Sequence, residues 1–511
     1  MKLDTSTDPQ VGFRPPGPLD AASALDRYDG VFTRRHAAHL LRRAGFGGTP
    51  SEIDTLTALG ASGAVDSVLH PTGDEVAFAN YPDPALLYDD KTRNATAQNW
   101  WLDRMLRTRR PLTEKMTLFW HGHFATSIRK VPAVLMVEQI DLLRTNALGN
   151  FRTLLVSISK DPAMLVWLDN RYNNKLHPNE NYAREVMELF ALGLGNYTED
   201  DVKNAARAFT GWTVDKSQSA AYKPALHDDG PKTLLGRTGP FGGEDVVDII
   251  AQQPVHQRFI CRKLLEFFVY SDPEPELIEG LARTYALSGY DLAQTVGTIL
   301  RSNVFFSTRA YRALPKSPIE FTIGLLRLMN VSEVPKDTIG WLQRMGQEPM
   351  APPSVKGWDG GPTWINTATL LARFNYVNRL VKAAPPRPPS EAPPQMTGTT
   401  ATSATMTAAT MPAGTTTGTA MTAAAAAATF PAFTPDDIVR QSGGLNAGRV
   451  LAAIVADTVQ DDVTGDVRRT LADYLQSTGA SLPTPFGPEN YQEKIRGALA
   501  LALNLPANQL N

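Results

Sequence analysis

Residues 99 to 211 carry one amphipathic helical pattern after another, and this succession constrains the fold more than any other feature. Apolar residues recur there every three or four positions, which is the spacing of a helix with one buried face. Six helices are expected, over residues 100–109, 113–121, 133–148, 151–160, 180–192 and 198–209. The pattern predicts a mainly α fold with a multi-helix globular body.

Two segments interrupt this pattern. Residues 210 to 243 are rich in Gly, Pro and Thr with scattered aromatic residues, which indicates loops with a short β-hairpin. Residues 383 to 433 consist mostly of Pro, Thr, Ala, Met and Gly with almost no charge. Such a composition cannot bury enough apolar surface to offset the entropy of ordering, so a disordered linker is expected.

Four regions follow from these boundaries. Residues 1–32 are polar and Pro-rich and predict a flexible arm, and residues 33–382 form the main helical domain. After the linker at 383–433, residues 434–511 again show helical spacing. Their last helix is too apolar to stand alone in water, so this segment is expected to pack back onto the main body.

Composition and charge exclude several classes of protein. Fifty basic residues against fifty-two acidic ones give a net charge of -2, which argues against a nucleic-acid binder or a polybasic membrane partner. No apolar run approaches the ~20 residues of a membrane span, and residues 1–9 lack the apolar stretch of an export signal. The single cysteine, Cys261, excludes a disulfide framework and predicts a small buried side chain. A soluble cytoplasmic protein is expected.

The helix expected at 180–192 carries carboxylates beside its apolar face. Glu185 and Glu188 share one polar stripe, where they could act as general base or as metal ligands, with Arg184 orienting a substrate or binding an anion. Arg184 also lies four residues from Glu180 and from Glu188. A helix stabilised by ion pairs therefore remains the alternative.

A pair of histidines ends the helix expected at 113–121. His121 lies in its last turn and His123 follows Gly122, so both imidazoles could chelate one divalent metal such as zinc or iron. Glu185 and Glu188 would supply the carboxylate ligands. The alternative is that His121 bonds helix carbonyls and His123 is a packed aromatic ring.

Two further segments contain candidate residues. Trp358 and Trp364 frame a glycine-rich turn that could bind a sugar or another flat ligand, with Asp359 and Asn366 fixing it. A loop held by buried indoles is the alternative. Residues 227–232 begin with His227, but there turn chemistry alone explains the Asp-Gly pair.

Five motifs occur in one order along the chain, and together they resemble the bacterial domain of unknown function 1800 family. They are His39-Leu-Leu-Arg-Arg-Ala-Gly-Phe-Gly47, Phe119-Trp-His-Gly-His-Phe124, Pro178-Asn-Glu-Asn-Tyr-Ala-Arg-Glu185 with residues 188–190, Phe209-Thr-Gly-Trp212, and Val355-Lys-Gly-Trp358 with residues 364–367. The resemblance covers roughly residues 35–382 and resumes at 505–510. It implies no established activity.

The resemblance also implies a cellular context. Members of this family often carry export signals and are often encoded beside a second family that resembles sulfatases and alkaline phosphatases. A neighbouring gene product of that kind is therefore an expected partner. This chain departs from the family in showing no export signal and in carrying the Thr- and Ala-rich segment.

Two functional hypotheses follow. The first is an enzyme of unknown substrate with a metal-assisted or acid/base site, for which hydrolysis is the default because a bound divalent metal lowers the pKa of water. The second is a non-catalytic helical scaffold or ligand-binding protein, in which the same His, Glu and Arg residues form a structural polar network. Arginines paired with Glu185 and Glu188 would favour the second.

Overall fold

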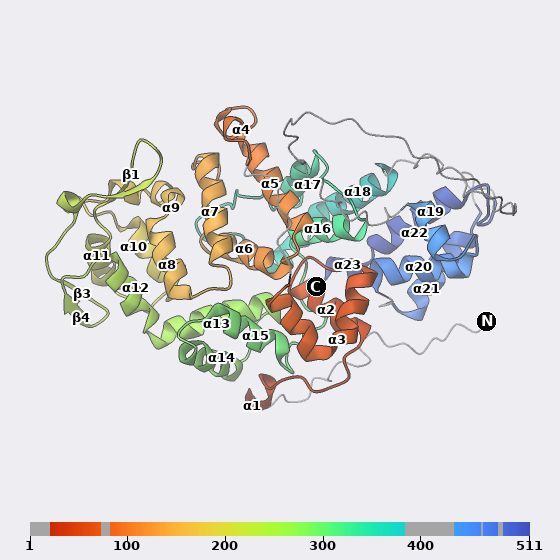
Figure 1. The fold of residues 1–511 in the computed structure, drawn as a ribbon, viewed down its shortest axis with the longest axis horizontal. Coiled ribbons are helices and arrows are strands. Elements are labelled where there is room, and N and C mark those ends of the chain that lie inside the picture. The colour runs from red at the N-terminus through yellow and green to blue at the C-terminus, as the bar shows by residue number, and fades with distance from the viewer. Residues whose placement is uncertain (1–20, 73–81, 384–433, 461–462, 479–483) are drawn as a thin grey trace, which may run out of the picture.

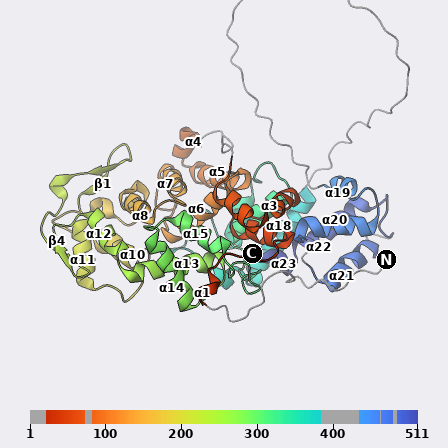
Figure 2. The ribbon, with the colours of Figure 1, turned by 60° about the horizontal axis from the view of Figure 1, so that its bottom comes forward.

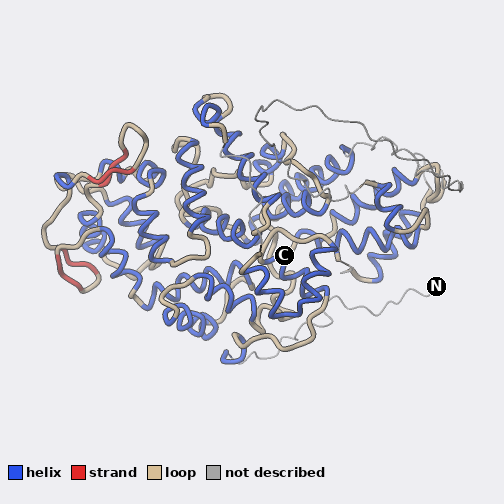
Figure 3. The backbone as a smooth tube through the Cα atoms, viewed as in Figure 1, coloured by secondary structure: helices blue, strands red, loops and turns tan. Residues whose placement is uncertain are grey.

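The protein is a mainly α-helical body, as a computed structural model shows (Figure 1). The structure describes residues 21–72, 82–383, 434–460, 463–478 and 484–511. In this part of the chain only two short antiparallel hairpins interrupt the helices (Figure 3). The predicted fold class is confirmed, whereas the linker expected at 383–433 lies outside the described residues except for Ala383.

In the described residues up to the carboxylate-bearing helix α10, helices are joined by loops and no strand is formed. Its elements are α1 (Ala21–Ala24), α2 (Arg34–Arg43), α3 (Pro50–Leu69), α4 (Pro84–Tyr88), α5 (Arg93–Arg107), α6 (Pro111–His123), α7 (Ala133–Thr145), α8 (Phe151–Lys160), α9 (Pro162–Trp167) and α10 (Glu180–Glu188).

The hairpins come next and are followed by helices to the end of the chain. These elements are α11 (Glu199–Ala208), β1 (Trp212–Val214), β2 (Ala220–Tyr222), β3 (Lys232–Leu234), β4 (Arg237–Gly239), α12 (Gly243–Ala251), α13 (Pro254–Phe268), α14 (Pro275–Leu287), α15 (Leu292–Arg301), α16 (Pro318–Leu328), α17 (Thr338–Arg344), α18 (Thr367–Ala383), α19 (Pro435–Gln441), α20 (Ala447–Val459), α21 (Gly465–Gln476), α22 (Tyr491–Leu503) and α23 (Pro506–Gln509).

Side-chain caps fix where several of these helices begin. Thr49 and Glu52 form the predicted capping box of α3, in which the backbone N–H of Thr49 donates to the Glu52 carboxylate at 2.7 Å. Thr198 caps α11 in the same way. The side chain of Asn179 accepts from the Asn181 amide at 3.0 Å and so starts α10.

The hairpins and the C-terminal helices lie at opposite ends of the body in both views (Figures 1 and 2). Helix α22 contacts α18, and the Arg496 guanidinium donates to the carbonyl of Val381 at 2.7 Å. Leu510 forms a β-bridge with Pro315. These contacts join residues 434–511 to the main body, while the exact domain boundaries remain a prediction.

Residues 21–32 also contact the body. The Tyr28 amide donates to the Arg301 carbonyl at 2.8 Å, and its ring packs against Phe306. Only residues 1–20 of the expected arm lie outside the described part. Cys261 is buried, as predicted. None of the described helices is both long and apolar enough to cross a lipid bilayer.

Candidate functional site

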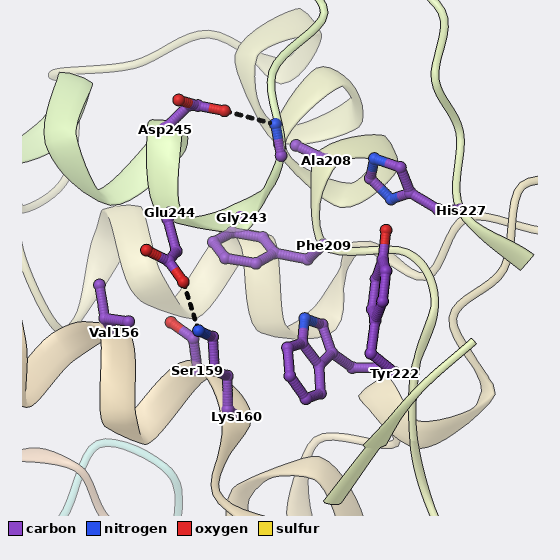
Figure 4. A pocket seen from close by; sticks show the side chains of 12 residues that line it. Val156, Ser159, Lys160, Ala208, Phe209, Tyr222, His227, Gly243, Glu244 and Asp245 are labelled. Atoms are coloured by element: carbon purple, nitrogen blue, oxygen red, sulfur yellow. Dashed lines mark hydrogen bonds and ion pairs between the residues drawn. The ribbon is translucent and has the colours of Figure 1, made fainter. Parts of the chain in front are cut away.

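A cavity of about 210 Å³ lies between the end of α8, the end of α11, the β1–β2 hairpin and the start of α12 (Figure 4). We call it the aromatic pocket. It is lined by Val156, Ser159, Lys160, Ala208, Phe209, Trp212, Tyr222, His227, Gly242, Gly243, Glu244 and Asp245. Phe209 and Trp212, the two ends of the fourth motif, form one wall.

The rings of this wall are set by the hairpin register. Trp212 and Tyr222 are cross-strand partners, and their ring centroids are 5.3 Å apart. Gly211 has a φ of +96°, and a Cβ there would lie 2.9 Å from a ring carbon of Tyr222. A side chain at this position would displace the tyrosine ring, so the glycine keeps the pocket wall in place.

An ion pair crosses the rim of the pocket. The Lys160 ammonium, at the end of α8, donates to the carboxylate of Glu244 in the first turn of α12 (Figure 4). The same ammonium lies 5.3 Å from the ring centroid of Trp212. Both side chains are partly exposed, so this pair adds little stability and stays within reach of a ligand.

His227 is buried at the edge of the pocket with a defined tautomer. Its Nδ1 lies 2.9 Å from the carbonyl oxygen of Thr210, which can only accept, so Nδ1 carries the proton of the neutral ring. Nε2 then presents a lone pair, and no described residue bonds to it. Figure 4 shows the hydroxyl end of Tyr222 directed toward this imidazole, with ring centroids 5.9 Å apart.

Burial and the nearby Asp229 raise the pKa of Tyr222, so its hydroxyl stays protonated at neutral pH. On the opposite wall, Ser159 donates to the Leu155 carbonyl and accepts from the hydroxyl of Tyr182 at 2.8 Å. Tyr182 belongs to α10 and packs edge-on against Phe209, at a ring distance of 5.0 Å. The third and fourth motifs therefore meet behind the pocket.

Arg184 forms no ion pair with either of the two predicted catalytic carboxylates. Its guanidinium pairs with Glu180 at 3.2 Å and with Glu199 of α11 at 2.7 Å. The alternative of ion pairs along α10 thus holds for Glu180, and for neither Glu185 nor Glu188. Arg184 ties α10 to α11.

Glu185 and Glu188 differ in their partners. Glu188 accepts a hydrogen bond from the Tyr197 hydroxyl at 2.7 Å, and burial together with this bond raises the pKa of Tyr197 to about 12. The Glu185 carboxylate is half-buried and has no hydrogen bond or ion pair with any described residue. Burial, and then the charge of Glu188, raises the pKa of Glu185. An acid/base role for this pair stays a prediction.

The two predicted metal-ligating histidines are both buried, each among different neighbours. His121 packs edge-on between Trp101 and Trp358, and burial lowers its pKa to about 3. His123 donates from Nε2 to the Phe190 carbonyl at 2.9 Å. Neither ring nitrogen of His121 has a hydrogen-bond partner, so it does not bond the helix carbonyls.

The structure does not gather His121, His123, Glu185 and Glu188 into a metal site. Among the described residues no group of three or more His, Cys, Asp or Glu side chains is placed to hold a metal ion. His123 follows its alternative, that of a packed aromatic ring, because it lies against Phe124 and Phe190.

Of the predicted ligand-binding residues in the tryptophan segment, Trp358 lines a cavity. This cavity measures about 460 Å³ and also contacts Arg129 and Glu348, which form an ion pair at 2.7 Å. The far side of Trp358 covers His121. A ligand role for Trp358 remains open to test.

The other three predicted residues of this segment have partners within it. Trp364 is buried, Asp359 pairs with Lys356 at 2.8 Å, and Asn366 accepts from the Thr369 amide at 3.0 Å near the start of α18. The burial of Trp364 matches the alternative of a loop held by buried indoles.

A sequence model of a family described as protein of unknown function (DUF1800) matches residues 39–510. The chain belongs to the DUF1800 family. The resemblance predicted from the five motifs is confirmed, and the match spans the C-terminal helices as well. No curated protein and no solved structure matches this DUF1800 chain. Its function must therefore be argued from the site.

Sequence reasoning missed most of the aromatic pocket. Asp228 does serve the predicted turn, because it accepts from the Gly230 amide at 2.9 Å. The neighbouring His227, however, lines the aromatic pocket. Lys160 and Glu244 gave no signal, since each is an ordinary charged residue at a helix end. The motif at 209–212 was the one available pointer to this part of the DUF1800 chain.

Asp161 is a buried carboxylate directly after Lys160. It accepts from the Gln139 amide at 2.7 Å and from the Met164 backbone at 2.8 Å, yet burial raises its pKa to about 7. Aspartate in an unfolded chain titrates near pH 4, so the carboxyl of Asp161 stays protonated to a higher pH in the folded state than in the unfolded state. Stability should therefore fall as pH rises from about 4 to about 7.

The prediction is tested by urea unfolding at pH 5.5 and pH 8. Relative to the Asp161→Asn variant, the parent should lose about 2 kcal/mol of unfolding free energy between these values, from linkage alone. Equal pH slopes in parent and variant would show that Asp161 titrates normally in the fold.

Proposed function

We propose that this DUF1800 protein is an acid/base hydrolase that cleaves an ester in the aromatic pocket. The observation that carries the proposal is the hydrogen bond from Nδ1 of His227 to the Thr210 carbonyl, which leaves the Nε2 lone pair without a partner. A histidine held in this way can accept a proton from water as the water attacks.

The rest of the pocket supplies the other groups that ester hydrolysis requires. Gly243 and Glu244, in the first turn of α12, line the cavity, and their backbone amides have no hydrogen-bond partner among the described residues. They lie at the positive end of the helix dipole and could stabilise a developing oxyanion. The protonated hydroxyl of Tyr222 could donate a hydrogen bond to the leaving oxygen, which receives its proton from His227.

The test measures hydrolysis of p-nitrophenyl esters of short acids by the purified protein, with p-nitrophenyl glycosides as the comparison. We expect ester turnover in the parent. His227→Gln should lower kcat by about a hundredfold or more, since a positioned base contributes 10²–10⁴-fold. Tyr222→Phe should lower it less.

A matched set of variants distinguishes this site from the predicted one on α10. Glu185→Gln and Glu188→Gln should leave turnover unchanged under the present proposal. If they abolish it while His227→Gln does not, catalysis belongs to the α10 carboxylates. A parent that hydrolyses none of the esters would contradict the proposal and favour a ligand-binding protein.

A further inference from the structure

The size of the aromatic pocket restricts its ligand. About 210 Å³ is smaller than the ~300–1,000 Å³ of sites for drug-sized molecules, so the cavity takes a single ring with short substituents. Its walls present the faces and edges of Phe209, Trp212 and Tyr222. Such walls suit a ring with at least one apolar face.

The charges of the lining restrict the ligand further. Lys160 is accompanied by Glu244, with which it pairs, and by Asp245, whose carboxylate accepts from the Gly242 amide at 2.8 Å. An anionic ligand would meet these two carboxylates, and a cationic one would meet the ammonium that already lies over Trp212. A neutral ligand avoids both the repulsion by the carboxylates and the repulsion by the ammonium.

The residues that line the cavity include both hydrogen-bond donors and hydrogen-bond acceptors. Lys160 donates, the carboxylate of Glu244 accepts, Nε2 of His227 accepts, and the hydroxyl of Tyr222 can do both. A hydroxyl group can donate and accept at the same time, so a ring that carries several hydroxyl groups suits a lining with both donors and acceptors.

We infer that the aromatic pocket binds a neutral sugar ring, stacked on Trp212, and that the substrate is an O-acylated sugar. The reaction in this inference rests on the proposed ester hydrolysis, whereas the binding of a sugar ring does not. Water attacks the acyl carbon as His227 takes its proton, the bond from that carbon to the sugar oxygen breaks, and the proton returns to the sugar oxygen. The products are the free sugar and a carboxylic acid.

Binding is tested on the full chain by isothermal titration with methyl glucoside, galactoside and mannoside, with benzoate as a flat anion. We expect one glycoside to bind. Trp212→Ala should weaken it about tenfold, the equivalent of losing one aromatic stacking contact. Glu244→Gln, at a partly exposed position, should also weaken it and keeps the test valid if the tryptophan variant unfolds.

Trp341→Ala is the matched control. Its indole is partly exposed, and the Arg344 guanidinium lies 4.8 Å from the ring centroid, as the Lys160 ammonium lies near Trp212. Unlike Trp212, it lines neither of the cavities described above. This variant should bind the glycoside as the parent does. Binding of benzoate without any glycoside, or no binding at all, would overturn the sugar inference.

Turnover separates this inference from the proposed function. Acetate release from an O-acetylated methyl glycoside, lost in His227→Gln while glycoside binding persists, supports both. Glycoside binding without any ester hydrolysis supports the sugar site and overturns the reaction. Ester hydrolysis without glycoside binding supports the reaction and overturns the substrate class.

Discussion

Replacing Gly357 with alanine should lower the free energy of unfolding by about 3 kcal/mol or more. Gly357 has a φ of +87°, and a Cβ there would lie 2.1 Å from the carbonyl oxygen of Gly122. The substitution therefore combines a strained backbone conformation with a clash against backbone that cannot move aside. Each of these effects costs about 1–3 kcal/mol.

Gly346 provides the control for this experiment. Its φ is +92°, but a Cβ there would meet nothing within 4 Å. Gly346→Ala should therefore cost only the backbone term, about 1 kcal/mol. Urea unfolding of both variants isolates the contact between the loop at 355–358 and the end of α6. Equal losses would show that this contact is not what requires glycine at position 357.

The helices could be predicted because their signals are local. Helix α8 begins and ends at the expected residues, since Asn150 caps its start and its apolar spacing stops at Lys160. Helix α10 ends four residues earlier than expected. The amides of Leu192 and Gly193 both return to the Met187 carbonyl, so the apolar residues after Glu188 form a turn with the same spacing as a helix.

The site could be predicted only in part, because it depends on contacts between residues far apart in sequence. The i to i+4 rule suggested Glu180 and Glu188 as partners of Arg184, but the structure adds Glu199 from the next helix and leaves Glu188 to Tyr197. Burial of His121 likewise comes from Trp358, more than two hundred residues away. No local pattern records such contacts.

Glu114, in the first turn of α6, holds three elements together from a buried position. Its side chain is 1 % exposed. It accepts hydrogen bonds from the Arg144 guanidinium of α7 and from the Trp101 indole of α5 at 3.3 Å, and it pairs with Arg104 at 3.4 Å. The carboxylate of Glu114 thus balances charge on both arginines, and Asp141 also pairs with Arg144.

Glu114→Gln should therefore lower the free energy of unfolding by about 3–5 kcal/mol, because it keeps the volume of the side chain but removes a buried negative charge that Arg144 and Arg104 share. Asp248→Asn is the matched control. Asp248 also accepts two hydrogen bonds from one arginine, Arg152, but both side chains are 38 % exposed. Water can replace that partner, so the control should cost less than about 1 kcal/mol in the same urea titration. A Glu114 variant as stable as the control would mean that solvent reaches Arg144 and Arg104 in the fold, and that α6 is positioned by its apolar contacts alone.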